Sequence, residues 1–131
     1  MHKKTTTDAN ELFNAGKLLL GDSFIGVFPR DKIPPLRKNT GVIVNLDTSK
    51  QKGSHWIAIF KFLNGKTLVY DSFGRDLTKY IHVKGNAVDI KDREQRDPSI
   101  GDKKRETNCG QRSLAFLVLS YNFGYDNAKL I

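Results

Sequence analysis

The sequence predicts an α+β fold: a mixed, largely antiparallel central sheet packed on a buried helix that carries Cys109 at its N-terminus. Three observations support this fold class. A helical pattern opens the chain, β-branched and aromatic residues dominate three segments between residues 40 and 71, and an apolar helical segment starts near residue 109. The chain has 131 residues, a length typical of one domain, so we expect a single domain over residues 1–131.

The first helix is predicted to begin at Asp8. Asp8 and Glu11 have the spacing of a capping box, in which each side chain accepts a hydrogen bond from the other residue's backbone. Gly21 is the expected C-terminal stop. The apolar face that we expect to be buried consists of Leu12, Ala15, Leu18 and Leu19. The next segment, "GVFPRDKIPPL" (26–36), is rich in proline and predicts irregular structure.

Three strands are predicted next, in "TGVIVNL" (40–46), "HWIAIFKFL" (55–63) and "KTLVYD" (66–71). The second of these segments is apolar almost throughout, so both faces of its strand should be covered. Asn64-Gly65 favours a two-residue hairpin turn, which pairs residue 63 with residue 66. His55 and Asp71 then lie at the same end of the hairpin, three positions or about 10 Å apart along an ideal ladder. A bulge, strand twist or turn at His55 would have to close this gap.

The remaining segments predict short elements and one long loop. We expect short strands in "YIHV" (80–83) and "AVDI" (87–90), and an exposed charged loop over residues 91–106. The final helix should begin at Cys109 or Gly110. Its apolar residues, which indicate a central position, are Leu114, Leu117 and Val118, flanked by Phe116 and Tyr121.

Composition and charge limit the classes of protein to consider. The net charge of +8 favours solubility and attraction to polyanions. No stretch approaches the roughly 20 apolar residues of a membrane span, and "MHKKTTTDANELF" lacks the apolar region of a signal peptide. The single cysteine cannot form an internal disulfide. We therefore expect a reducing, intracellular location and no membrane partner.

Three polar residues at element ends suggest nucleophilic chemistry. A thiol at a helix N-terminus, as expected for Cys109, has a lowered pKa because of the backbone N–H groups and the helix dipole. An imidazole such as His55 can complete a thiolate–imidazolium pair, and a carboxylate such as Asp71 can orient the imidazole. Each residue also has an ordinary structural interpretation, since a lone cysteine is more often a small buried apolar residue than a nucleophile.

In combination, the motifs resemble those of a known enzyme family. "GSHWIAI", "VYDSFG" and "NCGQRSLAFL", in this order, resemble the adenovirus-type (adenain-like) cysteine proteases. These enzymes belong to a clan that includes the SUMO-processing and related deubiquitin-like proteases. "GVFPRDKIP" is also similar to an upstream segment of viral and virus-derived members. The resemblance covers roughly residues 24–120 and implies the adenain/SUMO-protease-like fold.

The resemblance implies a role for each matching residue. Cys109 matches the nucleophile, His55 the general base and Asp71 the acid that orients it. Trp56 matches the aromatic residue beside the catalytic histidine, which lines the substrate site and shields the pair from water.

The family also places a glutamine about six or seven residues before the cysteine, where its amide completes the oxyanion hole. Here that position holds Asp102 and Lys103, and the nearest upstream glutamine is Gln95. Either an insertion lets Gln95 reach the site, which we favour, or another donor such as Asn108 replaces it. Gln111, inside the final helix, is interpreted as structural.

The resemblance implies a cysteine endopeptidase with a Cys109-His55-Asp71 triad and Gln95 in the oxyanion hole. It implies a viral or virus-derived maturation protease, in the host cell or the virion, that cleaves precursor proteins at small-residue, Gly-containing sites. The partner is then a protein or polyprotein substrate. No resident cofactor is expected, although family members are activated by a peptide or by DNA.

Four alternatives remain open at this point. The first is a protease that removes SUMO, ubiquitin or a similar modifier with the same site. The second is a basic nucleic-acid-binding module, suggested by the net charge of +8 and by "DKKR", although no nucleic-acid motif is recognisable. The third is a metal site formed by Cys109, His55 and His82, which lack close ligand spacing. The fourth is an inactive protease homologue.

Overall fold

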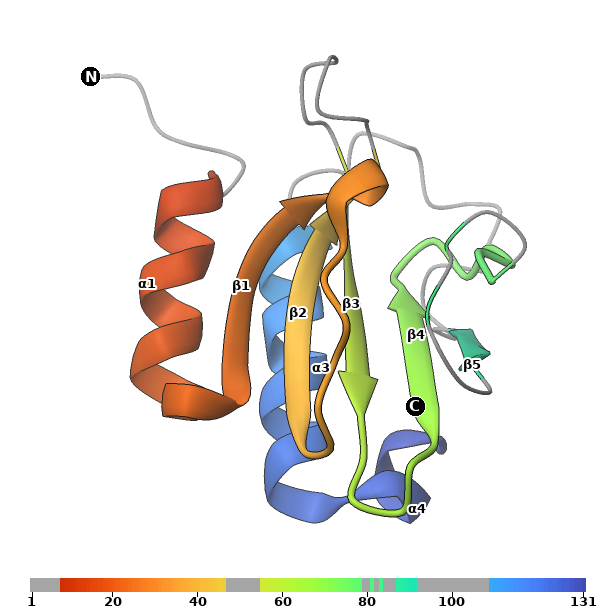
Figure 1. The fold of residues 1–131 in the computed structure, drawn as a ribbon. Coiled ribbons are helices and arrows are strands. Elements are labelled where there is room, and N and C mark those ends of the chain that lie inside the picture. The colour runs from red at the N-terminus through yellow and green to blue at the C-terminus, as the bar shows by residue number, and fades with distance from the viewer. Residues whose placement is uncertain (1–7, 47–54, 79–80, 82, 84–86, 92–108) are drawn as a thin grey trace.

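The computed structural model describes residues 8–46, 55–78, 81, 83, 87–91 and 109–131. Five strands form one sheet in the order β1-β2-β3-β4-β5. The strands are β1 (Phe24–Pro29), β2 (Thr40–Asn45), β3 (Trp56–Lys61), β4 (Thr67–Asp71) and β5 (Ala87–Lys91). The helices are α1 (Ala9–Leu20), α3 (Cys109–Phe123) and α4 (Tyr125–Ala128). The predicted α+β fold, with a mixed sheet packed against helices, is confirmed (Figure 1).

The expectation of a largely antiparallel sheet is wrong. The two central pairs, β2–β3 and β3–β4, are antiparallel, but the outer pairs β1–β2 and β4–β5 are parallel. Parallel and antiparallel pairs are therefore equally numerous among the described strands. The difference arises at the sheet edges, where β1 was not predicted and where β5 follows β4 through a long connection rather than a tight turn.

Both faces of the sheet are covered. Helix α3 lies across one face, with α1 and α4 beside it, and the segment between β1 and β2 crosses the other face (Figure 1). On the α3 face the core includes Ile43, Ala58, Phe60, Leu68, Tyr70, Phe116 and Leu117. On the opposite face it includes Leu36, Val42, Val44, Ile57, Ile59, Val69 and Leu77. The prediction that β3 is buried on both sides is confirmed.

Helix α1 has the predicted ends but a different buried face. The capping box forms, with the Glu11 N–H donating to Asp8 Oδ1 at 2.9 Å and the Asp8 N–H donating to Glu11 Oε1 at 3.3 Å. Gly21 follows the last turn with φ 58°. The buried residues are Leu12, Gly16 and Leu20, whereas Leu18 and Leu19 are 85% and 51% exposed.

Gly16 explains this rotation of α1. A Cβ at Gly16 would lie 2.5 Å from Cε2 of Phe24, so the helix approaches β1 closely only through the glycine. The contact at Gly16 turns Leu18 and Leu19 toward solvent.

Residues 26–29 of strand β1 fall in the segment that was expected to be irregular. Its last residue is Pro29, and β1 is the edge of the sheet. A proline is tolerated at the end of an edge strand because no neighbouring strand there needs its missing N–H.

The β3–β4 hairpin has a different register from the predicted one. Lys61 pairs with Thr67 and Phe60 with Leu68, so the connection is a three-residue loop, residues 63–65, not a two-residue turn. The Phe62 N–H donates to Lys66 O at 2.8 Å, and the Gly65 N–H donates to Phe62 O at 2.9 Å. Gly65 adopts φ 85°, as expected for the glycine that closes a loop of this length.

Helix α3 begins at Cys109, as predicted, and it is buried on one face. That face consists of Cys109, Gly110, Ser113, Phe116, Leu117 and Ser120. Strand β5 confirms the prediction for "AVDI". In "YIHV", Ile81 and Val83 are not in a strand, and the other two residues lie outside the described part, as do residues 92–106 of the predicted loop. Among the described residues, no helix is long and apolar enough to cross a membrane.

Candidate active site

Three element ends meet at one end of the sheet. The start of β3, the end of β4 and the start of α3 all lie at the upper end in Figure 1. His55 immediately precedes β3, Asp71 is the last residue of β4 and Cys109 is the first residue of α3. All three side chains are buried. The fold thus brings together the three residues that the sequence singles out for nucleophilic chemistry.

The register of the hairpin places His55 within reach of Asp71. Continued beyond the last pair, the observed register sets His55 opposite Phe73 and Asp71 opposite Ile57. The two residues are then two positions apart, and residues two apart on a strand point to the same face. Residues three positions apart, as in the predicted register, would point to opposite faces. The His55 Nε2 and Asp71 Oδ1 atoms are 2.6 Å apart.

The carboxylate of Asp71 is held on both of its oxygens. Oδ1 accepts from His55 and from the Phe73 N–H at 3.0 Å, and Oδ2 accepts from the Arg75 N–H at 3.3 Å and from Arg75 Nε at 2.8 Å. Burial by itself raises the pKa of Asp71, but the hydrogen bonds from His55, Arg75 and Phe73 outweigh burial and lower the pKa overall. Asp71 is therefore an ionised, fixed acceptor for His55.

The imidazole of His55 lies between this acceptor and the thiol. The Phe73 ring stacks on it, with ring centroids 4.0 Å apart and an interplanar angle of 28°. Because Asp71 takes Nε2, the other ring nitrogen, Nδ1, is the one left for Cys109. Nδ1 is buried and has no hydrogen bond of standard geometry within the described part of the chain. Catalytic hydrogen bonds are often long or misaligned before substrate binds.

The pKa of His55 is nevertheless sensitive to the thiol. Burial lowers the pKa of His55, but the hydrogen bond to Asp71, the interaction with the Cys109 thiol and the charges of both groups raise it overall. The charged imidazolium is thus favoured in the folded protein.

Cys109 shows the complementary change. Burial raises the pKa of the thiol, but His55 and hydrogen bonds from the backbone of Trp56 and Gly110 outweigh burial and lower the pKa overall. The thiol also lies in the first turn of α3, where the helix dipole favours an anion. The lowered pKa of Cys109 and the raised pKa of His55 together favour a thiolate–imidazolium pair.

Trp56 packs against the first turn of α3. A Cβ at Gly110 would lie 3.2 Å from Trp56 Cδ1, so the absence of a side chain at Gly110 lets the helix sit close to the indole. The Ser113 hydroxyl donates to the Trp56 backbone carbonyl at 3.1 Å. Both contacts fix the helix start against the strand start.

The structure gathers Cys109, His55 and Asp71 and places Trp56 beside them. Gln95 and its alternative Asn108 lie outside the described residues, as does His82 of the metal-site alternative. Gln111 is exposed on α3. Within the described ranges, no group of three or more His, Cys, Asp and Glu side chains could hold a metal ion.

The sequence analysis did not assign roles to Phe73, Arg75 and Ser113, which support the site. The sequence did contain a signal for Arg75, because a cationic residue four positions after Asp71 can pair with its carboxylate. No local pattern points to the Ser113–Trp56 bond, because it joins residues 57 positions apart.

No protein-family model matches this sequence, and no curated protein is significantly similar to it.

Proposed function

We propose that the protein is a cysteine endopeptidase with Cys109 as nucleophile, His55 as general acid and base, and Asp71 as the residue that orients His55. The observation that carries the proposal is the 2.6 Å contact between buried His55 and buried Asp71, beside a helix that begins at the only cysteine of the chain. Mutual pKa changes at His55 and Cys109 support the same pair.

The first step would form a thioester. The Cys109 thiolate attacks the carbonyl carbon of the scissile peptide bond, whose oxygen takes up the negative charge. The tetrahedral intermediate collapses as the peptide C–N bond breaks. The imidazolium of His55 gives its Nδ1 proton to the departing amine. Cys109 is now acylated and His55 is neutral.

The second step would hydrolyse the thioester. Neutral His55 takes a proton from a water molecule through Nδ1, and the resulting hydroxide attacks the thioester carbon. The C–S bond breaks, the carboxylic product leaves, and the thiolate–imidazolium pair is restored. During both steps Asp71 keeps its bond to Nε2, which fixes the ring orientation and stabilises the imidazolium.

The developing oxyanion needs hydrogen-bond donors. The first turn of a helix directs backbone N–H groups outward from its start, so the N–H of Cys109 is suited to one side of the oxyanion hole. By resemblance, Gln95 supplies the second donor, its side-chain amide.

The fold-family assignment and the substrate class belong to this proposal. We infer an adenovirus-type peptidase fold, because the chain order His55, Asp71, Cys109 and the central helix beginning at the cysteine are those of that family. Cys109 is only 2% exposed, so a bulky side chain next to the scissile bond would clash near the thiol. This confinement supports cleavage at Gly-containing sites of precursor proteins.

The deciding experiment compares the protein with its Cys109→Ala variant on peptides that carry a Gly-Gly segment before a fluorescent amine. We expect the substitution to reduce cleavage to background, because no other group of the site can form the thioester. Thermal unfolding of both proteins checks that the variant is folded. Cleavage by a folded Cys109→Ala protein would contradict the proposal.

Two further kinds of substrate distinguish removal of a modifier from cleavage of precursor proteins by the same site. A ubiquitin-like modifier ending in Gly-Gly, fused to a reporter, tests deconjugation, while a set of unstructured precursor segments tests maturation. Preference for the precursor segments is the outcome that we propose.

A further inference from the structure

The Arg75 side chain contacts two groups that themselves contact His55, the Asp71 carboxylate and the Phe73 ring. Its Nε donates to Asp71 Oδ2 at 2.8 Å, on the carboxylate whose other oxygen is 2.6 Å from His55 Nε2. Its guanidinium carbon also lies 4.9 Å from the centroid of the Phe73 ring, the ring that stacks on His55. Two cationic groups, Arg75 and the imidazolium, are thus joined through one carboxylate and one aromatic ring.

We propose that Arg75 sets the proton affinity of His55 by sharing the Asp71 carboxylate with it. The catalytic consequence rests on the proposed function, whereas the electrostatic effect does not. Arg75 acts through Asp71 and is therefore a positioning and tuning residue.

The position of Asp71 does not depend on the Arg75 side chain alone. The backbone N–H groups of Phe73 and Arg75 also donate to the carboxylate, one to each oxygen. Removal of the guanidinium would leave these two bonds and the bond to His55. The main contribution of the Arg75 side chain is therefore its charge.

The sign of this contribution follows from the groups that face His55. Within the described residues they are Asp71 from β4, Cys109 from α3 and Arg75 from the turn after β4. Asp71 and the Cys109 thiolate favour the imidazolium. The permanent positive charge of Arg75 opposes it, both by like-charge repulsion and by drawing the Asp71 charge toward Oδ2. Loss of Arg75 should make His55 harder to deprotonate.

The consequence for catalysis lies at the alkaline side of the pH profile. Protonated His55 must donate to the leaving amine, so turnover falls as pH rises through the pKa of His55. Arg75 would keep that limit closer to neutral pH. It would help His55 to release its proton to the leaving amine in the first step, while making neutral His55 a weaker base toward water in the second.

The effect can be measured on His55 itself, by NMR titration of histidine-labelled protein. Cys109→Ala serves as the parent, so that titration of the thiol does not couple to the ring, and His55→Ala identifies the signal among the three histidines. In Arg75→Gln the ratio of imidazolium to imidazole at a fixed pH should rise about threefold or more. Arg75→Met, which keeps an aliphatic stem near Phe73, is a second neutral variant.

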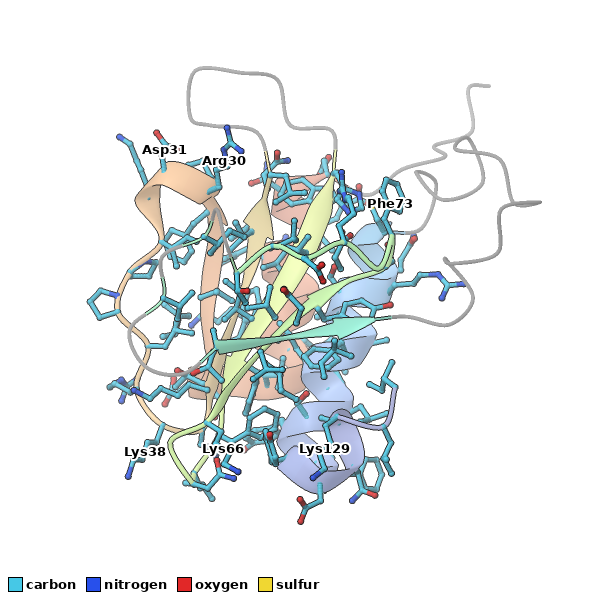
Figure 2. The ribbon with its side chains drawn as sticks, turned by 90° about the vertical axis from the view of Figure 1, so that its right-hand side faces the viewer. Arg30, Asp31, Lys38, Lys66, Phe73 and Lys129 are labelled. Atoms are coloured by element: carbon cyan, nitrogen blue, oxygen red, sulfur yellow. The ribbon has the colours of Figure 1, made fainter. Side chains whose placement is uncertain are left out.

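Two further variants separate charge from other effects. Arg75→Lys keeps the charge and should restore the parent titration. Arg30→Gln removes the same charge from an exposed residue on the other side of the molecule from Phe73, and should leave His55 unchanged (Figure 2).

An unchanged or lower imidazolium ratio in the neutral Arg75 variants would overturn the inference. So would an equal response to Arg30→Gln. Neither result would contradict the proposed function. The proposed function fails in a different test, if His55 does not activate the thiol of the unmodified protein.

Discussion

Ser113 connects the first turn of α3 to the start of β3. Its hydroxyl is fully buried and donates to the Trp56 carbonyl at 3.1 Å. Trp56 follows His55, and the Trp56 backbone also stabilises the Cys109 thiolate. The bond therefore helps to set the spacing between the proposed nucleophile and its base.

We predict that Ser113→Ala lowers the free energy of unfolding by about 1 kcal/mol, because a buried hydrogen bond is lost and the Trp56 carbonyl loses that donor. It should also slow alkylation of Cys109 at pH 6. Urea unfolding and iodoacetamide kinetics measure the two effects.

Ser120 offers a matched control on the same helix. It is also buried, but its hydroxyl has no hydrogen-bond partner within the part of the chain that the structure describes. Ser120→Ala should be neutral or stabilising and leave alkylation unchanged. Equal effects of the two substitutions would show that the Ser113 bond has no special role.

At the scale of single residues, the sequence predicted the three residues of the proposed triad but not the residues that hold them in position. Cys109, His55 and Asp71 were recognisable because few residue types perform this chemistry and each stood at an expected element end. Phe73 and Arg75 reach the site only because the turn after β4 folds back on Asp71. That geometry depends on tertiary contacts, which local patterns do not record.

The β3–β4 hairpin shows how one residue of register decides the site. Asn-Gly favours a two-residue turn, but a glycine at φ 85° also suits a three-residue loop. Packing decides between them, since the observed register puts Phe60, Leu68 and Tyr70 on the α3 face. A slip of one residue would move a whole set of side chains to the opposite face.

Gly65→Ala tests this element. The substituted Cβ has open space, with Lys38 Cε at 4.0 Å as the nearest atom, so the cost comes from the positive φ alone. We expect a loss of roughly 1–2 kcal/mol in the free energy of unfolding. Gly65→Asn should lose less, because asparagine tolerates this conformation better. An alanine variant as stable as the parent would contradict the assigned loop.

For the other elements, a strong local sequence pattern separates the correct predictions from the wrong ones. The capping box of α1 and the start of α3 were predicted correctly because short-range hydrogen bonds and apolar spacing determine them. The buried face of α1 was predicted wrongly, because the contact between Gly16 and Phe24 determines which face is buried. Strand β1 was missed because Pro29 and the two prolines at positions 34 and 35 predicted irregular structure despite the apolar residues of the strand.

At the scale of the whole molecule, the fold brings residues 55, 71 and 109 together at one end of the sheet (Figure 1). The α+β class was predictable from element types, but the parallel outer pairs were not, because they join strands through long connections.

Part of the positive charge of the chain lies away from the proposed active site. Three exposed lysines, Lys38, Lys66 and Lys129, lie toward the end of the molecule opposite Phe73 (Figure 2). Attraction to polyanions, inferred from the net charge of +8, stays a prediction.

The most direct test of the account is the pH dependence of Cys109 alkylation, in the protein and in His55→Ala. The chain has one cysteine, so the rate reports a single site. Because the pKa of Cys109 is lowered by His55, the thiolate should persist well below the ordinary thiol pKa of about 8.5. The rate should fall only as pH drops through the lowered pKa.

We expect alkylation at pH 6 to be on the order of 100-fold faster than for an ordinary thiol, and His55→Ala to move the titration back toward about pH 8.5. Thermal unfolding of His55→Ala serves as the control for its fold. A thiol that titrates in the ordinary range in the parent protein, or one that is activated equally without His55, would contradict the thiolate–imidazolium pair on which the proposed function depends.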